Sequence, residues 1–198
     1  MSDEAQRALI VKDATSLLLE NGYGRTTTDG VAARCRISKQ TLYRHFPGKH
    51  ALIAAIVDSH RQSMLALPGD YDGMPLDQAL EKIFRTDIDP QADRERVALL
   101  TLVMLEAQEF PEFEDILRRH GGDRSRAELA KWLGAQCRRG LMKIEDIDGA
   151  AQILMDMIFG AVVFKLGRGI QWPGRKMRNA HIRQCVAIFL GGVVPRRS

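Results

Sequence analysis

The sequence predicts an all-helical protein, with an N-terminal three-helix domain of the helix-turn-helix type and a C-terminal helical bundle. Three observations predict this class. Apolar residues recur at helical spacing along most of the 198 residues, no long run alternates apolar and polar residues as a strand would, and Pro and Gly separate the helical segments. The count of separated segments is about nine or ten helices.

The first helix is expected over 5–21, where Ile10, Ala14 and Leu18 fall on one helical face. Gly22 should end it, because glycine accepts the left-handed conformation of a helix C-terminus. A second, short helix should follow residues 26–28, since a threonine hydroxyl can accept hydrogen bonds from free backbone N–H groups.

The third helix should begin at Ser38, another good capping residue, and end near Phe46 before Pro47 and Gly48. A fourth is expected over 49–64. Residues 67–75 are rich in turn formers and form the clearest boundary, so we predict domains at 1–65 and 75–198. Further helices are expected near 76–87, 92–109, 112–120, 123–139, 146–167 and 174–191, separated by Pro90, Pro111, Gly121-Gly122, Gly140 and 172–174.

The third helix carries the side chains expected to contact a binding partner. If Leu42 and Phe46 face the core, Gln40 and Arg44 point away from it. Amide and guanidinium groups read adenine and guanine edges. Residues 25–49 hold six basic residues and one acid, which suits a polyanion. The alternative is an ordinary solvated helix face.

The stretch from Thr27 to Lys49 resembles the DNA-binding domain of the tetracycline-repressor (TetR/AcrR) family, and the helix ending at Gly22-Tyr23 matches it too. Arg36 stands where the family commonly has glycine, so a positive φ is expected there. Gly30 stands where a polar residue is usual, at a cost of about 1 kcal/mol of helix stability. The resemblance implies the following DNA contacts. Thr27, Tyr43, His45 and Lys49 would bind phosphates; Lys39, Gln40, Thr41 and Arg44 would lie in the major groove; and Ser38 belongs to the same surface.

The C-terminal half is similar to the regulatory domains of the AcrR-like branch, which implies a homodimer through the helices near 146–167 and 174–191 and a pseudo-palindromic operator in double-stranded DNA. We also expect a small, largely apolar effector. Its predicted pocket would use Met104, Glu106, Phe110, Trp132, Gln152, Asp156 and Phe159. The alternative for Glu106 and Asp156 is a solvent-facing position or an ion pair.

The function expected from this pattern is a ligand-responsive transcriptional regulator, in the family a repressor. A constitutive DNA-binding dimer without a ligand, and a helical enzyme, are the alternatives. The sequence holds no Gly-rich phosphate loop, HExxH or GxSxG motif, and its histidines lack metal-ligand spacing, so we expect no catalytic residue, metal or cofactor. Three scattered cysteines, a polar start and an apolar stretch too short for a bilayer favour a cytoplasmic protein without a membrane segment.

Overall fold

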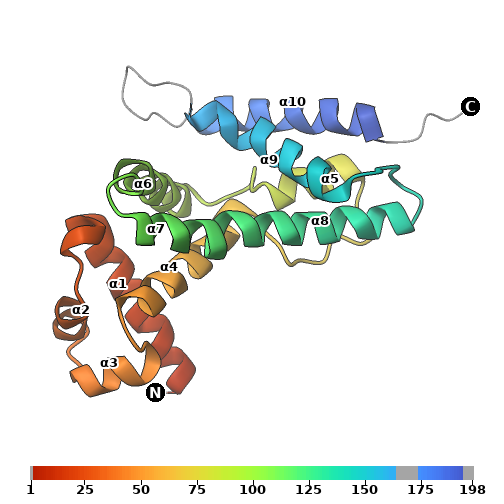
Figure 1. Cartoon of the computed structure of the whole chain (residues 1–198). Helices are drawn as coiled ribbons and strands as arrows, with labels where there is room; N and C mark the ends of the chain where they lie inside the picture. Colours follow the sequence, from red (N-terminus) through yellow and green to blue (C-terminus); the bar gives the residue numbers. More distant parts are fainter. Residues whose placement is uncertain (1, 164–173, 194–198) are drawn as a thin grey trace, which may run out of the picture. The chain divides into compact units, whose positions relative to one another are not determined.

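The protein is described from a computed structural model, which covers residues 2–163 and 174–193. Every regular element within these ranges is a helix: ten α-helices and one π-helix (Figure 1). The predicted all-helical class is therefore confirmed.

The first four helices are α1 (Asp3–Arg25), α2 (Thr28–Arg34), α3 (Lys39–His45) and α4 (Lys49–Met64), close to the predicted segments. Gly22 was expected to end the first helix. It does leave the helical conformation, with φ of 79° and ψ of 172°, but the chain makes a further short turn and α1 ends only at Arg25.

The later helices are α5 (Leu76–Ile83), α6 (Pro90–Glu106), α7 (Pro111–Ile116), the π-helix η1 (Leu117–Gly122), α8 (Asp123–Arg138), α9 (Ile147–Val163) and α10 (Arg175–Val193). The predicted break at Gly121-Gly122 is wrong, because these glycines lie in η1, which leads directly into α8. A wider helical turn thus takes the place of the expected loop. Residues 164–167 of the predicted helix at 146–167 lie outside the described residues.

The chain forms two compact units that do not follow chain order. Unit 1 consists of residues 1–62 and 90–122, and unit 2 consists of residues 63–89 and 123–198. In unit 1, Leu99 of α6 and Phe113 of α7 join the apolar core of the first four helices. Burial of these side chains explains why residues 90–122 belong with the N-terminal helices. The predicted domains at 1–65 and 75–198 stay a prediction.

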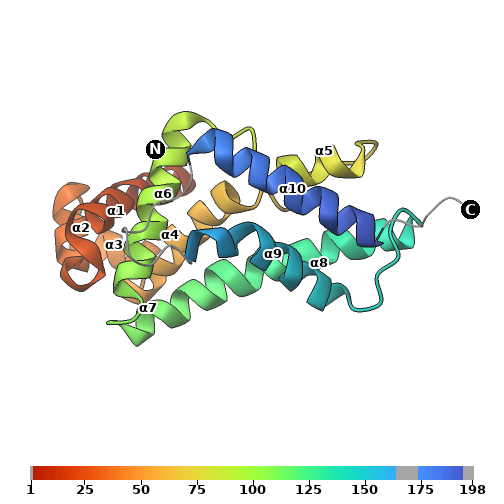
Figure 2. The ribbon, with the colours of Figure 1, turned by 90° about the horizontal axis from the view of Figure 1, so that it is seen from above.

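Unit 2 is built from α5, α8, α9 and α10. Helix α9 packs against both α8 and α10, and α10 also packs against α5 (Figure 2). Its core includes Leu80, Leu133, Leu154 and Ile182, all at most 2% exposed. None of the helices in the described ranges has the length and apolar character needed to cross a membrane.

Candidate nucleic-acid interface

The α2–turn–α3 segment is held by local hydrogen bonds. The Thr27 hydroxyl accepts from the Gly30 N–H (3.1 Å), and the Ser38 hydroxyl accepts from the Thr41 N–H (3.0 Å), so both short helices have the predicted N-caps. Between them Arg36 has φ of 54°, as expected for a position where glycine is usual. This conformation costs a non-glycine residue about 1–2 kcal/mol.

The orientation of α3 follows from its two apolar anchors. Leu42 and Phe46 are 0% and 1% exposed, which confirms that this pair faces the core. Gln40, Tyr43 and Arg44 are consequently exposed on the other side of the helix, while Thr41 and His45 are partly buried. The outward face therefore presents amide, phenol and guanidinium groups together, the donors and acceptors needed to contact base edges and phosphates.

Exposed acidic side chains pair with some of these basic groups. Lys39 Nζ donates to the Asp29 carboxylate (2.6 Å), which raises the pKa of Lys39. Arg34, at the end of α2, makes two bonds to the Glu20 carboxylate (2.6 and 2.7 Å). Both pairs are solvent-exposed, so they add little to the stability of the fold.

The start of α1 lies beside the end of α3, a contact that the sequence pattern did not predict. The Gln6 amide oxygen accepts from Arg44 Nη2 (3.3 Å) and lies 3.0 Å from His45 Nε2. An Asp3 carboxylate oxygen lies 3.9 Å from Arg44 Nη2 and 3.7 Å from His45 Nε2. These residues are about forty positions apart along the chain, so no local spacing could have indicated the contact.

Lys49, the first residue of α4, is held by Tyr23. Its Nζ donates to the Tyr23 carbonyl (2.5 Å) and lies 3.9 Å from the centre of the Tyr23 ring. Burial lowers the pKa of Lys49, and the carboxylates of Glu112 and Glu106 oppose that shift. Tyr23 thus supports this surface from beneath, since it is itself buried.

The residues predicted to line a ligand pocket are distributed over both units. Glu106 and Phe110 belong to unit 1, whereas Trp132, Gln152, Asp156 and Phe159 belong to unit 2. The side chain of Met104 is outside the described part of the structure.

Most of the predicted pocket residues have partners within their own unit. The Glu106 carboxylate accepts from the Tyr23 N–H. Gln152 and Asp156 are exposed on α9 and bond to each other (2.8 Å). Trp132 borders an open hollow of about 560 Å³ in unit 2, next to residues 68–72.

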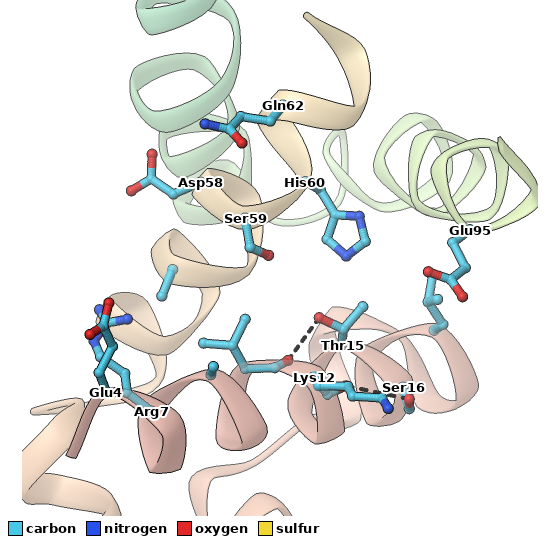
Figure 3. A pocket seen from close by; sticks show the side chains of 14 residues that line it. Glu4, Arg7, Lys12, Thr15, Ser16, Asp58, Ser59, His60, Gln62 and Glu95 are labelled. Carbon is cyan, nitrogen blue, oxygen red and sulfur yellow. Dashed lines mark hydrogen bonds between the residues drawn. The ribbon is translucent and has the colours of Figure 1, made fainter. Parts of the chain in front are cut away.

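A larger hollow, of about 780 Å³, lies in unit 1 between α1 and α4, with Glu95 of α6 at one end (Figure 3). His60 projects from α4 into this space, above Thr15 and Ser16 of α1. Burial lowers the pKa of His60, an effect that the Glu95 carboxylate opposes. None of the predicted ligand residues lines this hollow.

Comparison with known proteins shows that both the N-terminal and the C-terminal part of the chain match family models of transcriptional regulators. Residues 10–56 match the family model for bacterial regulatory proteins of the tetR family, and residues 78–192 match the model for the C-terminal domain of AefR-like transcriptional repressors. The HTH-type transcriptional regulator Rv1556 of Mycobacterium tuberculosis is 31% identical over 75% of this chain and 70% of its own length. UidR of Escherichia coli, also an HTH-type transcriptional regulator, is 28% identical over 98% of this chain and 96% of its own length.

Solved structures have the same fold. A TetR transcriptional regulator from Agrobacterium tumefaciens gives a TM-score of 0.70 at 22% identity, covering 99% of this chain and 97% of its own. The flavonoid-responsive regulator FrrA gives 0.68 at 24% identity, covering 98% of this chain and all (100%) of its own. These matches identify a regulator rather than an enzyme: the chain belongs to the TetR family of DNA-binding transcriptional regulators.

Proposed function

We propose that the protein is a homodimeric repressor that binds a pseudo-palindromic operator and releases it when a small molecule binds. The observation that carries the proposal is the exposed polar face of α3, on a helix that the Ser38 cap and two buried side chains hold in place. The similarity of residues 78–192 to AefR-like repressors supports repression.

In this proposal Gln40 and Arg44 read base edges, with Lys39 and Thr41 beside them in the major groove. Gln suits adenine and Arg suits guanine, and each good bidentate contact contributes about 1–3 kcal/mol of discrimination. Phosphates would be bound by the residues around this helix, namely Thr27, Ser38, Tyr43, His45 and Lys49.

The dimer would form through α9 and α10. Three large apolar side chains of these helices are exposed: Ile153 of α9 (58%), and Met177 (62%) and Ile188 (59%) of α10. Large apolar side chains on two neighbouring helices favour a partner that covers them. A two-fold axis there repeats the same contacts on both subunits and requires an operator with matching symmetry.

The ligand would bind in the C-terminal half, and Trp132 is the predicted contact to examine first. Its indole and the Tyr71 ring border the hollow in unit 2, which suits a small, largely apolar molecule. FrrA, whose name describes a flavonoid response, has the same fold, so this fold can accommodate a ligand. A ligand releases DNA only if it binds the DNA-free form more tightly.

The proposal is tested by recovering genomic fragments that bind the purified protein. We expect the enriched sites to contain inverted repeats with half-site centres about one helical turn, roughly 34 Å, apart. Compounds related to the products of neighbouring genes should then quench Trp132 fluorescence and release the DNA, while Trp132→Phe abolishes the quenching. Release by none of these compounds would favour a constitutive DNA-binding protein.

Sedimentation tests the dimer. The wild-type protein should sediment as a dimer at micromolar concentration, and Ile188→Arg should shift it to monomers, because an unpaired charge is costly in an apolar interface. The control Leu9→Arg changes an exposed leucine of α1 (44% exposed) and should leave the dimer intact. A wild-type monomer, with and without DNA, would contradict the proposal.

A further inference from the structure

The turn at residues 22–24, near the end of α1, is bonded to a carboxylate from α6. The Tyr23 N–H donates to Glu106, 83 residues further along the chain. Gly22 makes room for this bond: it has φ of 79°, and a Cβ there would overlap the Glu106 carboxylate. The conformation therefore requires glycine at this position, and a Cβ would also displace the Glu106 carboxylate.

Tyr23 is fixed by its side chain as well. The ring is 4% exposed, stacks on Phe113 (4.6 Å between centroids, 17° between planes) and is tilted against Phe110 (5.2 Å, 53°). Phe110 also packs closely against the same turn, since a Cβ on Gly24 would lie 2.8 Å from Phe110 Cζ. The end of α6 and the start of α7 thus hold the whole 22–24 turn.

The fixed Tyr23 in turn holds Lys49. One residue supplies two attractions to the same ammonium group: its carbonyl accepts a hydrogen bond (2.5 Å), and its ring lies 3.9 Å away. The ammonium has three N–H groups, and the Tyr23 carbonyl takes one. The Glu106 and Glu112 carboxylates also favour the charged form of Lys49.

We propose that Glu106 is a positioning residue for DNA binding: through the Tyr23 backbone, it holds the Lys49 ammonium where that group binds a DNA phosphate. This inference rests on the proposed phosphate contact of Lys49. A lysine that is already ordered loses less side-chain freedom when the phosphate arrives. Glu106 thus affects affinity without touching DNA, and its partner is a backbone N–H of its own unit.

The test measures binding to a mixed-sequence DNA duplex over a series of salt concentrations, because phosphate contacts do not depend on sequence. The proteins are the wild type, Lys49→Ala, Glu106→Ala, the double variant and Glu106→Gln. Lys49→Ala should flatten the dependence of log K on log salt by about one per subunit. Glu106→Ala should weaken binding about tenfold, as for loss of a charge-assisted hydrogen bond.

The double variant shows whether Glu106 affects DNA affinity through Lys49. With Lys49 already removed, Glu106→Ala should change the affinity by less than about twofold, because the two residues act through one contact. Glu106→Gln should stay near the wild type, since its amide oxygen still accepts from the Tyr23 N–H. Glu109→Ala is the matched control, because it removes an exposed carboxylate of the same unit and should leave affinity unchanged.

Fold-changes that multiply in the double variant, or a Glu106→Ala protein that binds as the wild type does, would overturn the inference. If Glu106→Ala does not fold, Glu106→Asp serves instead: it keeps the charge but is too short to reach Tyr23 and should weaken binding similarly. If Lys49→Ala leaves the salt dependence unchanged, Lys49 does not bind a phosphate. That result would contradict the proposed function itself, and it is seen without any Glu106 variant.

Discussion

Helices α3 and α10 differ in what they leave exposed. Helix α3 has seven residues, buries Leu42, and exposes amide and guanidinium groups. Helix α10 has 19 residues, buries a row of apolar side chains, and still exposes Met177 and Ile188. An exposed polar and basic face suits a polyanion, whereas an exposed apolar face suits another protein surface. The exposed side chains of each helix thus indicate its partner, and the buried ones fix its position.

The largest effect should come from removing the buried anchor of α3. Leu42→Ala should lower the free energy of unfolding by about 2–5 kcal/mol, because it leaves a cavity in a fully buried site. Ile182→Ala of α10, 2% exposed, should cost a similar amount. Urea unfolding followed by circular dichroism measures both. If the exposed control Leu9→Ala costs as much as Leu42→Ala, the anchoring role assigned to Leu42 is wrong.

The exposed face of α3 is tested by Arg44→Ala. We expect a loss of about 1–3 kcal/mol at one base position of each half-site, while the stability of the protein changes little. Competition binding with operators mutated at single positions measures this effect. Arg119→Ala, an exposed arginine of η1 paired with Asp115, is the control. An unchanged ranking of the mutated operators would show that Arg44 does not read bases.

A smaller effect is expected from the cap of α3. Ser38→Ala removes the hydroxyl that accepts from the Thr41 N–H and should cost about 1 kcal/mol of unfolding free energy. Ser16→Ala is the matched control within α1, where the hydroxyl bonds only a helix carbonyl, and should change stability by less than about 0.5 kcal/mol. Equal costs in thermal unfolding would mean that the short helix does not depend on its cap.

The smallest effect concerns pH. Burial lowers the pKa of His60 from its ordinary value of 6.5, so below pH 6.5 the unfolded chain binds a proton that the folded chain does not. This contribution to stability is complete above pH 6.5 and is lost as the pH falls toward the folded-state pKa. Urea unfolding between about pH 7.5 and 5 should show a shallower decline for His60→Gln than for the wild type. The control His50→Gln keeps His60 and should keep the steeper decline; identical slopes in the wild type and His60→Gln would contradict the assignment.

Short-range patterns in the sequence predicted much of unit 1. The approximate bounds of α3 and α4, the caps Thr27 and Ser38, and the inward pair Leu42 and Phe46 followed from residues within one or two turns of each other. The positive φ of Arg36 followed instead from the resemblance to the TetR family. Helix capping and helical periodicity act over three to four residues, so the sequence displays them directly. The resemblance to the TetR family that the sequence shows by itself depends on the same short stretch.

The tertiary structure decided the contacts between distant segments. The sequence indicated that Glu106, in an apolar helix, needed a partner, because an unpaired buried carboxylate is costly. The pattern predicts a ligand, solvent or an ion pair as that partner, and the structure supplies a backbone N–H instead. The contact of Gln6 with Arg44 and the packing of α6 with the first four helices belong to the same class. Their geometry depends on how whole helices pack, and no local spacing encodes which residues meet across that packing.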